Sequence, residues 1–297
     1  MIPGQFKKQM GQMYGSDGDK WIRSLPRFLH EFGQKHECDF GSPYILSYNF
    51  VAPLYYHNGK SAVLKVGYSA SDLTSELEAL RYFQGDRFVR VLEENTEEGW
   101  ILLQHLQPGT PLKSVQDDAV TVRVTGKILS SLWKEAPVNH GFLTVKKRAD
   151  SLHKLREEIA GKADHLPSRA IDKAETWFSE LLASVSNDYV LHGDLHHGNI
   201  LYSEENGWTG IDPKGVVGER EYDLIPFLLN EISSEDPIKQ LEFRAKSFAE
   251  QLQLNYERIL MWGYCHSILS GLWCLEDNLD CWENSFVCAR NFERLMD

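Results

Sequence analysis

The amino-acid pattern changes character once along the chain, at residues 104–111, a short segment with two prolines and a glycine. Before it, runs rich in aromatic and β-branched residues at 44–56 and 61–66 flank His57-Asn58-Gly59-Lys60, and Asn-Gly between such runs is a strong hairpin signal. After it, apolar residues recur mostly at helical spacing. The pattern predicts an α+β fold with two lobes.

The expected lobes have the following bounds. Residues 1–104 form an N-terminal helix and a small antiparallel β lobe with one inserted helix, residues 105–111 form a hinge, and residues 112–297 form a mainly helical lobe. In the first lobe we expect helices over 17–36 and 72–83 and further strands over 88–92 and 100–103, with Pro26 placed to kink the first helix. In the second lobe we expect helices over 115–133, 151–160, 171–185, 222–232, 237–253, 256–276 and 281–295.

Charge and composition exclude some classes of protein. The formal net charge is −12, which argues against a nucleic-acid or anionic-membrane partner and is compatible with a cationic substrate, although many soluble proteins are acidic. No run of 18 apolar residues and no secretory signal occur. The five cysteines are odd in number and form no CxxC pair, so we expect reduced core thiols and a cytoplasmic protein.

One island of short apolar runs and polar loops interrupts the helical part between residues 189 and 212. It contains His192-Gly193-Asp194-Leu195-His196-His197-Gly198-Asn199 and, after a strand pair, Ile211-Asp212. Phosphoryl transfer needs a carboxylate that orients and deprotonates the attacking hydroxyl, and hard oxygen ligands for Mg²⁺ on the triphosphate. Asp194, Asn199 and Asp212 meet both needs in a pattern close to the protein-kinase catalytic loop. The sequence therefore predicts a kinase.

Two alternatives remain open. His192, Asp194, His196 and His197 could bind a transition metal, and the segment is similar to the GDxHG box of metallophosphatases, which would make the protein a metal-dependent phosphohydrolase. That box has one residue fewer, and the D-x-H that a dinuclear site needs upstream is missing. The second alternative is a catalytically inactive kinase-like protein that only binds a ligand. His196 and His197 could each be simple turn residues.

A kinase also needs a strand lysine for the nucleotide phosphates and a helix glutamate to pair with it. Lys65 lies in an apolar strand of the first lobe, and Glu76 follows in the predicted helix, where we prefer it to Glu78. The first hairpin has no glycine-rich loop, so the remaining nucleotide contacts are assigned to Ser47 and to the hinge backbone from Gln104 to Leu106.

Several longer segments carry a family resemblance. The His-Gly-Asp sequence resembles the catalytic loop of the aminoglycoside phosphotransferase and choline kinase superfamily, which has a protein-kinase-like fold. The segments LHGDLHHGNIL, IDPKGVVGEREYD, LQHLQPGTPL and MWGYCHSILSGLWCLED resemble the aminoglycoside/hydroxyurea antibiotic resistance kinases, a group that includes streptomycin 6-phosphotransferase. The resemblance extends from about Trp21 to the C-terminus.

The resemblance implies an ATP- and Mg²⁺-dependent transfer to a small-molecule hydroxyl, with the nucleotide in the cleft. Asp194 would be the catalytic base, His192 would brace the loop, and Asn199 and Asp212 would bind magnesium. Asp223 would support the loop by accepting hydrogen bonds from its backbone, or would cap the helix that follows it.

The acceptor stays open between streptomycin, hydroxyurea, another aminoglycoside and a metabolite. A polycationic acceptor needs carboxylates and a ring-stacking surface. The candidates for this role are Glu219, Glu221, Glu231, Trp273, Glu276, Asp277 and Asp280. Trp273, Glu276 and Asp277 are preferred because they fall at helical spacing near the end of one predicted helix. The oligomeric state and the choice between ATP and GTP are left open.

Overall fold

The computed structural model describes residues 2–46, 48–68, 70–83, 87–159, 167–277 and 282–297. It divides the chain into two compact units. One comprises Met1–Gly109 with Ser203–Gly207, and the other comprises Thr110–Tyr202 with Trp208–Asp297. No helix of the described residues is long and apolar enough to cross a membrane.

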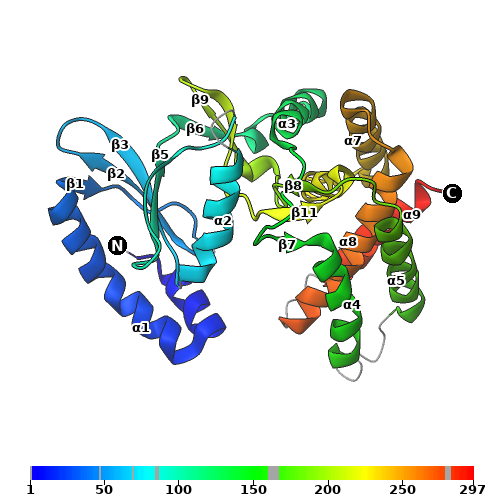
Figure 1. Ribbon diagram of the computed structural model, residues 1–297, viewed down its shortest axis with the longest axis horizontal. Helices are drawn as coiled ribbons and strands as arrows, with labels where there is room; N and C mark the ends of the chain where they lie inside the picture. Colours follow the sequence, from blue (N-terminus) through cyan, green and yellow to red (C-terminus); the bar gives the residue numbers. More distant parts are fainter. Residues whose placement is uncertain (1, 47, 69, 84–86, 160–166, 278–281) are drawn as a thin grey trace. The chain divides into compact units, whose positions relative to one another are not determined.

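The first unit is built on a five-stranded antiparallel sheet of order β1-β2-β3-β5-β4 (Figure 1). Its strands are β1 (Cys38–Phe40), β2 (Phe50–Tyr56), β3 (Ser61–Val66), β4 (Val91–Asn95) and β5 (Trp100–Gln104). The expected hairpin is confirmed: β2 and β3 pair in register, and Gly59 turns the chain at φ 84°. That positive φ is a conformation glycine adopts at no steric cost.

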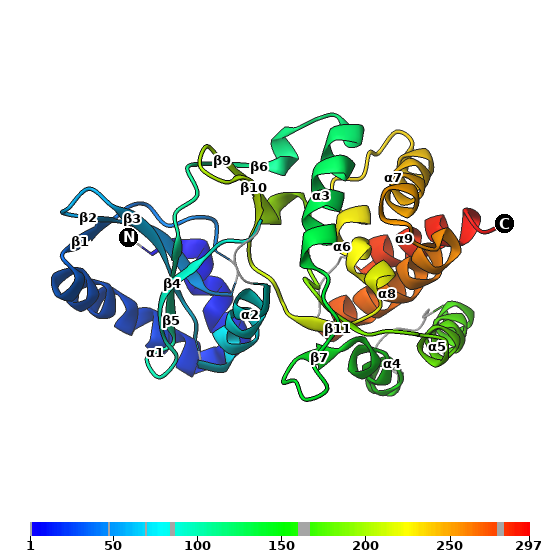
Figure 2. The same cartoon turned by 45° about the horizontal axis from the view of Figure 1, so that its top comes forward.

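Helix α1 (Gly4–His36) covers one face of this sheet (Figure 2). Its apolar side chains, among them Phe6, Leu25 and Phe32, pack in one core with Leu64 and Trp100 of the sheet. The helix begins at Gly4, well before the expected start.

The predicted kink in α1 is wrong in position. The non-helical backbone lies at Gly15, with φ 56°, whereas the helix continues through Pro26. A glycine can leave the helical region without steric cost, so it is the weaker point of this helix.

Helix α2 (Ala70–Phe83) is the inserted helix and belongs to the opposite side of the sheet. Successive side chains of a strand point to opposite faces. In β3 this alternation places Leu64 and Val66 in the core under α1 and turns Lys65 toward α2. Strand alternation therefore places the Lys65 side chain beside α2 and the apolar side chains on either side of it in the core.

The second unit is mainly helical. Its helices are α3 (Asp118–Leu132), α4 (Val145–Ile159), α5 (Ser168–Ala183), α6 (Ile225–Leu228), α7 (Pro237–Leu252), α8 (Tyr256–Glu276) and α9 (Trp282–Arg294), with 3-10 turns η1 (Leu112–Ser114), η2 (His197–Asn199) and η3 (Arg220–Leu224). Helix α8 is buried along most of its length and packs against α4, α5, α7 and α9. The helix expected over 222–232 is shorter: the chain there forms η3 and then the single turn of α6.

Short strands carry the loops of this part of the chain. β7 (Leu143–Thr144), β8 (Tyr189–Leu191) and β11 (Val216–Gly218) form a sheet of order β7-β11-β8, and β6 (Pro108–Pro111), β9 (Ile200–Ser203) and β10 (Gly207–Gly210) form a sheet of order β10-β9-β6. β7 and β11 were not expected, because two or three residues are too few to show an alternating pattern.

The cysteines differ from the expectation at one position. Cys38, Cys265 and Cys288 are free thiols, and Cys38 and Cys265 are buried, as predicted for core residues. Cys274 is disulfide-bonded, so the prediction of reduced thiols throughout is wrong. The odd number and the irregular spacing of the cysteines gave no signal for this bond.

Candidate active site

The loop at residues 192–199 follows β8 in the second unit, and Asp223 holds its start. The buried Asp223 carboxylate accepts hydrogen bonds from the backbone N–H groups of His192 (3.0 Å) and Gly193 (2.7 Å) and from the Trp133 indole (2.9 Å). Burial raises the pKa of this carboxyl, and the three donors oppose that shift. Asp223 does not cap the following helix, because α6 begins after Leu224 without a side-chain cap.

Gly193 permits a close approach within this loop. Its φ is +78°, and a Cβ there would lie 2.7 Å from the Val216 Cγ2 on the neighbouring strand β11. Any other residue would be strained twice, in its backbone and in this contact. The glycine therefore lets the loop turn sharply at the point where Asp194 begins.

His192 ties the loop to the segment that carries Asp212. Its Nδ1 accepts a hydrogen bond from the Asp194 N–H (3.2 Å), so the proton sits on Nε2, which donates to the Ile211 carbonyl (3.0 Å). Complete burial lowers the pKa of His192 to about 3. The ring is consequently neutral at physiological pH, and both of its nitrogens have structural hydrogen bonds.

Asn199 is fixed from the other end of the same loop. Its side-chain Nδ2 donates to the Asp194 backbone carbonyl (2.9 Å), and the Asn199 backbone carbonyl accepts from the Ile211 N–H (2.9 Å). This arrangement leaves the side-chain Oδ1 available as a ligand, since amide oxygens bind hard cations.

Two carboxylates share one cation at this site. The Lys214 Nζ lies 3.3 Å from the Asp212 Oδ2 and 3.9 Å from the Asp194 Oδ2, and all three side chains are partly exposed. Desolvation raises the pKa of Asp194, whereas Lys214 opposes this shift. Asp212 adopts φ 57°, in the left-handed region that aspartate and asparagine enter more readily than most other residues with a side chain. The carboxylates of Asp194 and Asp212 thus lie close together, with a cation already beside them.

This donor set fits a magnesium ion. Carboxylate and amide oxygens are the ligands that Mg²⁺ takes from proteins, with the remainder supplied by water and nucleotide phosphates. The position of the Lys214 ammonium shows that the site favours positive charge. Asp212 and Asn199 are the residues that could hold the metal.

The histidines of the loop are engaged in local structure. The His196 Nδ1 accepts from the Gly198 N–H (3.0 Å), and the His197 ring stacks on Phe227 and bonds Asn230 through Nδ1. Across the described ranges, no group of three or more His, Cys, Asp or Glu side chains is placed to hold a metal ion. These contacts give no support to a transition-metal site.

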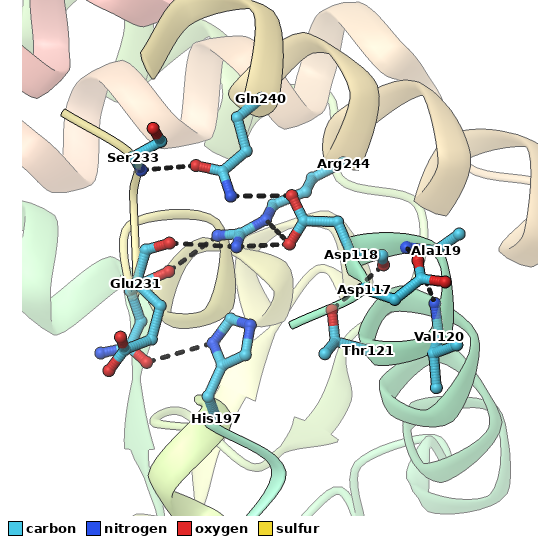
Figure 3. A network of polar contacts seen from close by, with 11 residues as sticks. Asp117, Asp118, Ala119, Val120, Thr121, His197, Glu231, Ser233, Gln240 and Arg244 are labelled. Atoms are coloured by element: carbon cyan, nitrogen blue, oxygen red, sulfur yellow. Dashed lines mark hydrogen bonds and ion pairs between the residues drawn. The ribbon is translucent and has the colours of Figure 1, made fainter. Parts of the chain in front are cut away.

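A buried ionic network supports the chain beyond this loop (Figure 3). The Arg244 guanidinium of α7 pairs with Asp118 at 2.7 Å and donates to the carbonyls of Asn230 (2.7 Å) and Glu231 (3.1 Å). The Asn230 Oδ1 in turn lies 3.1 Å from the His197 Nδ1, so the network reaches the loop itself. Burial lowers the pKa of His197 to about 4, which keeps this ring neutral.

In the first unit, Lys65 and Glu76 form a buried ion pair. The Lys65 Nζ lies 2.5 Å from the Glu76 Oε2, and both side chains are less than a tenth exposed. Glu76 rather than Glu78 is the partner. The pair has the residue types and the strand–helix placement that a phosphate-binding lysine requires.

The other residues assigned to nucleotide binding differ in whether their hydrogen-bonding groups are available. The Gln104 backbone N–H donates to the Arg90 carbonyl within the sheet (2.9 Å), and its side chain bonds Arg90 and Glu205. The Gln104 amide N–H is therefore already in use, and the backbone of His105 and Leu106 remains as the candidate for the adenine. Ser47 lies outside the described residues.

Two of the acidic residues proposed to bind a cationic acceptor have structural partners instead. Glu219 accepts from Arg258 (2.9 Å) and from the Trp262 indole (2.6 Å), and the buried Glu221 accepts from the Asn255 N–H at the start of α8. Neither side chain is available to a substrate, so these two assignments are at odds with the geometry.

A pocket of about 470 Å³ lies beside Asp194, entirely within the second unit. Trp273 lines this pocket as proposed, whereas Glu231, Glu276 and Asp277 do not, and Asp280 lies outside the described residues. Two cations line it, Arg148 and Lys214, and sequence reasoning had assigned a role to neither. Lys214 follows Asp212 by two residues and could have been noticed, but nothing in the sequence connects Arg148 to the loop.

Comparisons with known proteins place the chain in a family. Residues 47–278 match the family described as aminoglycoside/hydroxyurea antibiotic resistance kinase. The streptomycin 6-kinase of Streptomyces glaucescens is 27% identical over 93% of this chain and 91% of that protein. The hydroxyurea phosphotransferase of Kitasatospora aureofaciens is 26% identical over 93% of this chain and 81% of that protein.

A solved structure shows the same fold. The choline kinase of Streptococcus pneumoniae superposes with a TM-score of 0.65 at 15% identity, covering 92% of this chain and 99% of that one. This likeness confirms the α+β, protein-kinase-like fold, and the named relatives confirm the prediction of a small-molecule kinase over the phosphohydrolase. The chain belongs to the family of aminoglycoside/hydroxyurea antibiotic resistance kinases.

Proposed function

We propose that this protein transfers the γ-phosphate of ATP to a hydroxyl of a small polar molecule, with Mg²⁺ as cofactor. The observation that carries the proposal is the arrangement of Asp194, Asp212 and Lys214, two carboxylates that share one ammonium, beside a pocket lined by Asp194 and Lys214. The reaction belongs in the cytoplasm, where ATP is available. Streptomycin and hydroxyurea are the acceptors that the names of the relatives suggest.

Asp194 is the residue that we assign to the acceptor. Its carboxylate takes the hydrogen bond of the acceptor hydroxyl, orients the oxygen toward the γ-phosphorus and receives the proton as the new O–P bond forms and the bond to the ADP oxygen breaks. His192 and Asp223 position this carboxylate through the backbone of the loop.

The remaining charged residues act on the nucleotide. Lys65, held by Glu76, binds the phosphates, and Asp212 with Asn199 would hold the metal, whose charge would offset that of the triphosphate. Lys214 lies beside both carboxylates, and we assign it to the transferring phosphoryl group, whose negative charge its ammonium stabilises.

An ADP-release assay tests the proposal. Purified protein with ATP and MgCl₂ is offered a panel of aminoglycosides, hydroxyurea, amino alcohols, sugars and hydroxy acids, and at least one acceptor should raise ADP release above the rate without acceptor. The signal should vanish when EDTA replaces the metal. Binding of ATP with Mg²⁺ in a calorimetric titration, but no ADP release with any acceptor, would instead indicate an inactive kinase-like protein.

A further inference from the structure

The pocket beside Asp194, here called the acceptor pocket, is lined by Arg148, Asp194, Lys214, Leu229, His266 and Trp273 among others. If the proposed function holds, this pocket receives the molecule that is phosphorylated. Its charges should therefore match the charges of the acceptor.

Arg148 is the cation that the transfer chemistry does not use. It lies near the start of α4, its Nη1 donates to the Tyr222 hydroxyl at 3.4 Å, and its guanidinium carbon lies 5.9 Å from the Tyr222 ring centre and 6.0 Å from that of Trp273. Among the ion pairs of the described residues none involves Arg148, although its charge acts on the Asp194 and Asp223 carboxyls and opposes the rise that burial causes in the pKa of each. A guanidinium is always charged and has five donors, so most of its hydrogen-bonding capacity remains for a ligand.

His266 adds a second donor to the same wall. The contacts of the described residues give the Tyr222 hydroxyl proton no other acceptor, so it is donated to the His266 Nδ1 at 2.8 Å, and the proton of the neutral ring sits on Nε2. Burial lowers the pKa of His266 to about 3, which keeps the ring neutral at physiological pH. This side of the pocket therefore offers hydrogen-bond donors.

The carboxylates that a polycation needs are absent from the described lining of this pocket, apart from Asp194 itself. Asp194 already shares Lys214 with Asp212, and Glu219 and Glu221 are bonded elsewhere. An ammonium or guanidinium group of an acceptor would meet Arg148 as a like charge, which costs binding free energy in a partly desolvated site.

We propose that Arg148 binds an anionic group of the acceptor, a carboxylate being the simplest match, so that the acceptor is a hydroxy acid rather than a polycationic aminoglycoside. The guanidinium can bind both oxygens of such a group through parallel N–H donors. The Trp273 ring then covers a flat or apolar part of the molecule, and the hydroxyl faces Asp194.

Matched pairs of probes separate this proposal from a general need for ATP. Each pair differs in one charge: 4-(hydroxymethyl)benzoate against 4-(hydroxymethyl)benzamide, and gluconate against gluconamide, with streptomycin as the polycation. ADP release gives kcat and KM, and the change in melting temperature with ATP analogue and Mg²⁺ reports binding alone. We expect the acid of at least one pair to bind about tenfold or more tightly than its amide, the size of a charge-assisted hydrogen bond.

The variants are Arg148→Gln, Arg148→Lys and a control, Arg156→Gln. Arg156 lies on the same helix but is ion-paired with Asp172 and Glu175, away from the pocket. Arg148→Gln should remove the preference for the acid by raising its KM while leaving the KM for ATP unchanged. Arg148→Lys should keep part of the preference, and Arg156→Gln all of it.

Three results would overturn the inference: tighter binding of streptomycin than of every acid, binding of no acid, or an equal effect of Arg148→Gln on acid and amide. The last result would mean that Arg148 serves the transferred phosphate or the fold. Failure of the proposed function looks different, because acids would then bind in an Arg148-dependent way without any release of ADP.

Discussion

The two units each place a lysine beside carboxylates, but in opposite environments. Lys65 and Glu76 are buried together, whereas Lys214 lies beside Asp194 and Asp212 with about two-fifths of its side chain exposed. Burying a charge without its counter-charge is costly, so Lys65 and Glu76 each stabilise the other in the folded chain. Exposed ion pairs, by contrast, contribute little to the free energy of unfolding. The comparison indicates that the first lysine is fixed in advance of ligand binding, while the second can exchange its carboxylates for a phosphate.

Removing the buried lysine should have the largest effect on stability. Lys65→Met leaves the Glu76 carboxylate buried without its ammonium, and loss of one partner of a buried pair costs about 3–5 kcal/mol. Urea unfolding would measure this loss in the free energy of unfolding. The double variant Lys65→Met/Glu76→Met should recover most of it, because two apolar side chains need no counter-charge. Equal instability of the single and double variants would contradict this explanation.

Removing the exposed lysine should change rate far more than stability. Lys214→Met should lower kcat about 100-fold, the usual loss when one preorganised donor to a developing charge is removed. Its free energy of unfolding should change by less than about 1 kcal/mol, as for other exposed pairs. A normal kcat, or a loss of stability as large as that of Lys65→Met, would abolish the distinction between the two sites.

The pH dependence of stability should be the smallest effect. In the folded chain burial lowers the pKa of His192 and of His266 to about 3, whereas an exposed histidine has a pKa of about 6.5. Between these values the unfolded chain binds more protons, so stability is full above pH 6.5 and falls as the pH is lowered toward 3. The melting temperature of His266→Gln should therefore drop less than that of the wild type between pH 7 and pH 5. An identical drop would mean that His266 titrates normally in the folded protein.

Sequence reasoning succeeded where function rests on local patterns. Lys65 and Glu76 could be placed because strand alternation and a following helix are both visible in the sequence, and the loop from His192 to Asn199 is one continuous motif. Their roles in catalysis remain predictions, although the geometry agrees with them.

The remaining site residues could not be predicted, because their contacts join residues that are far apart in the sequence. Arg148 reaches the acceptor pocket from α4, 46 residues before Asp194, and its neighbours in the sequence only indicate an amphipathic helix. Glu219 and Glu221 appeared free in the sequence but bind Arg258 and the start of α8, because burial forces each carboxylate to find a donor. The acidic composition was compatible with a cationic acceptor, and the family resemblance suggested carboxylates to bind one, whereas the described pocket lining contains two cations, Arg148 and Lys214.

The central claim is that Asp194 receives the proton of the acceptor hydroxyl, and Asp194→Asn tests it most directly. With the best acceptor from the panel, ADP release by this variant should fall about 10²–10⁴-fold, the range for loss of a general base. The affinity for ATP with Mg²⁺, measured by calorimetric titration, should stay within about threefold of the wild type, since Lys65 and Asp212 remain. Unchanged turnover in Asp194→Asn would contradict the account.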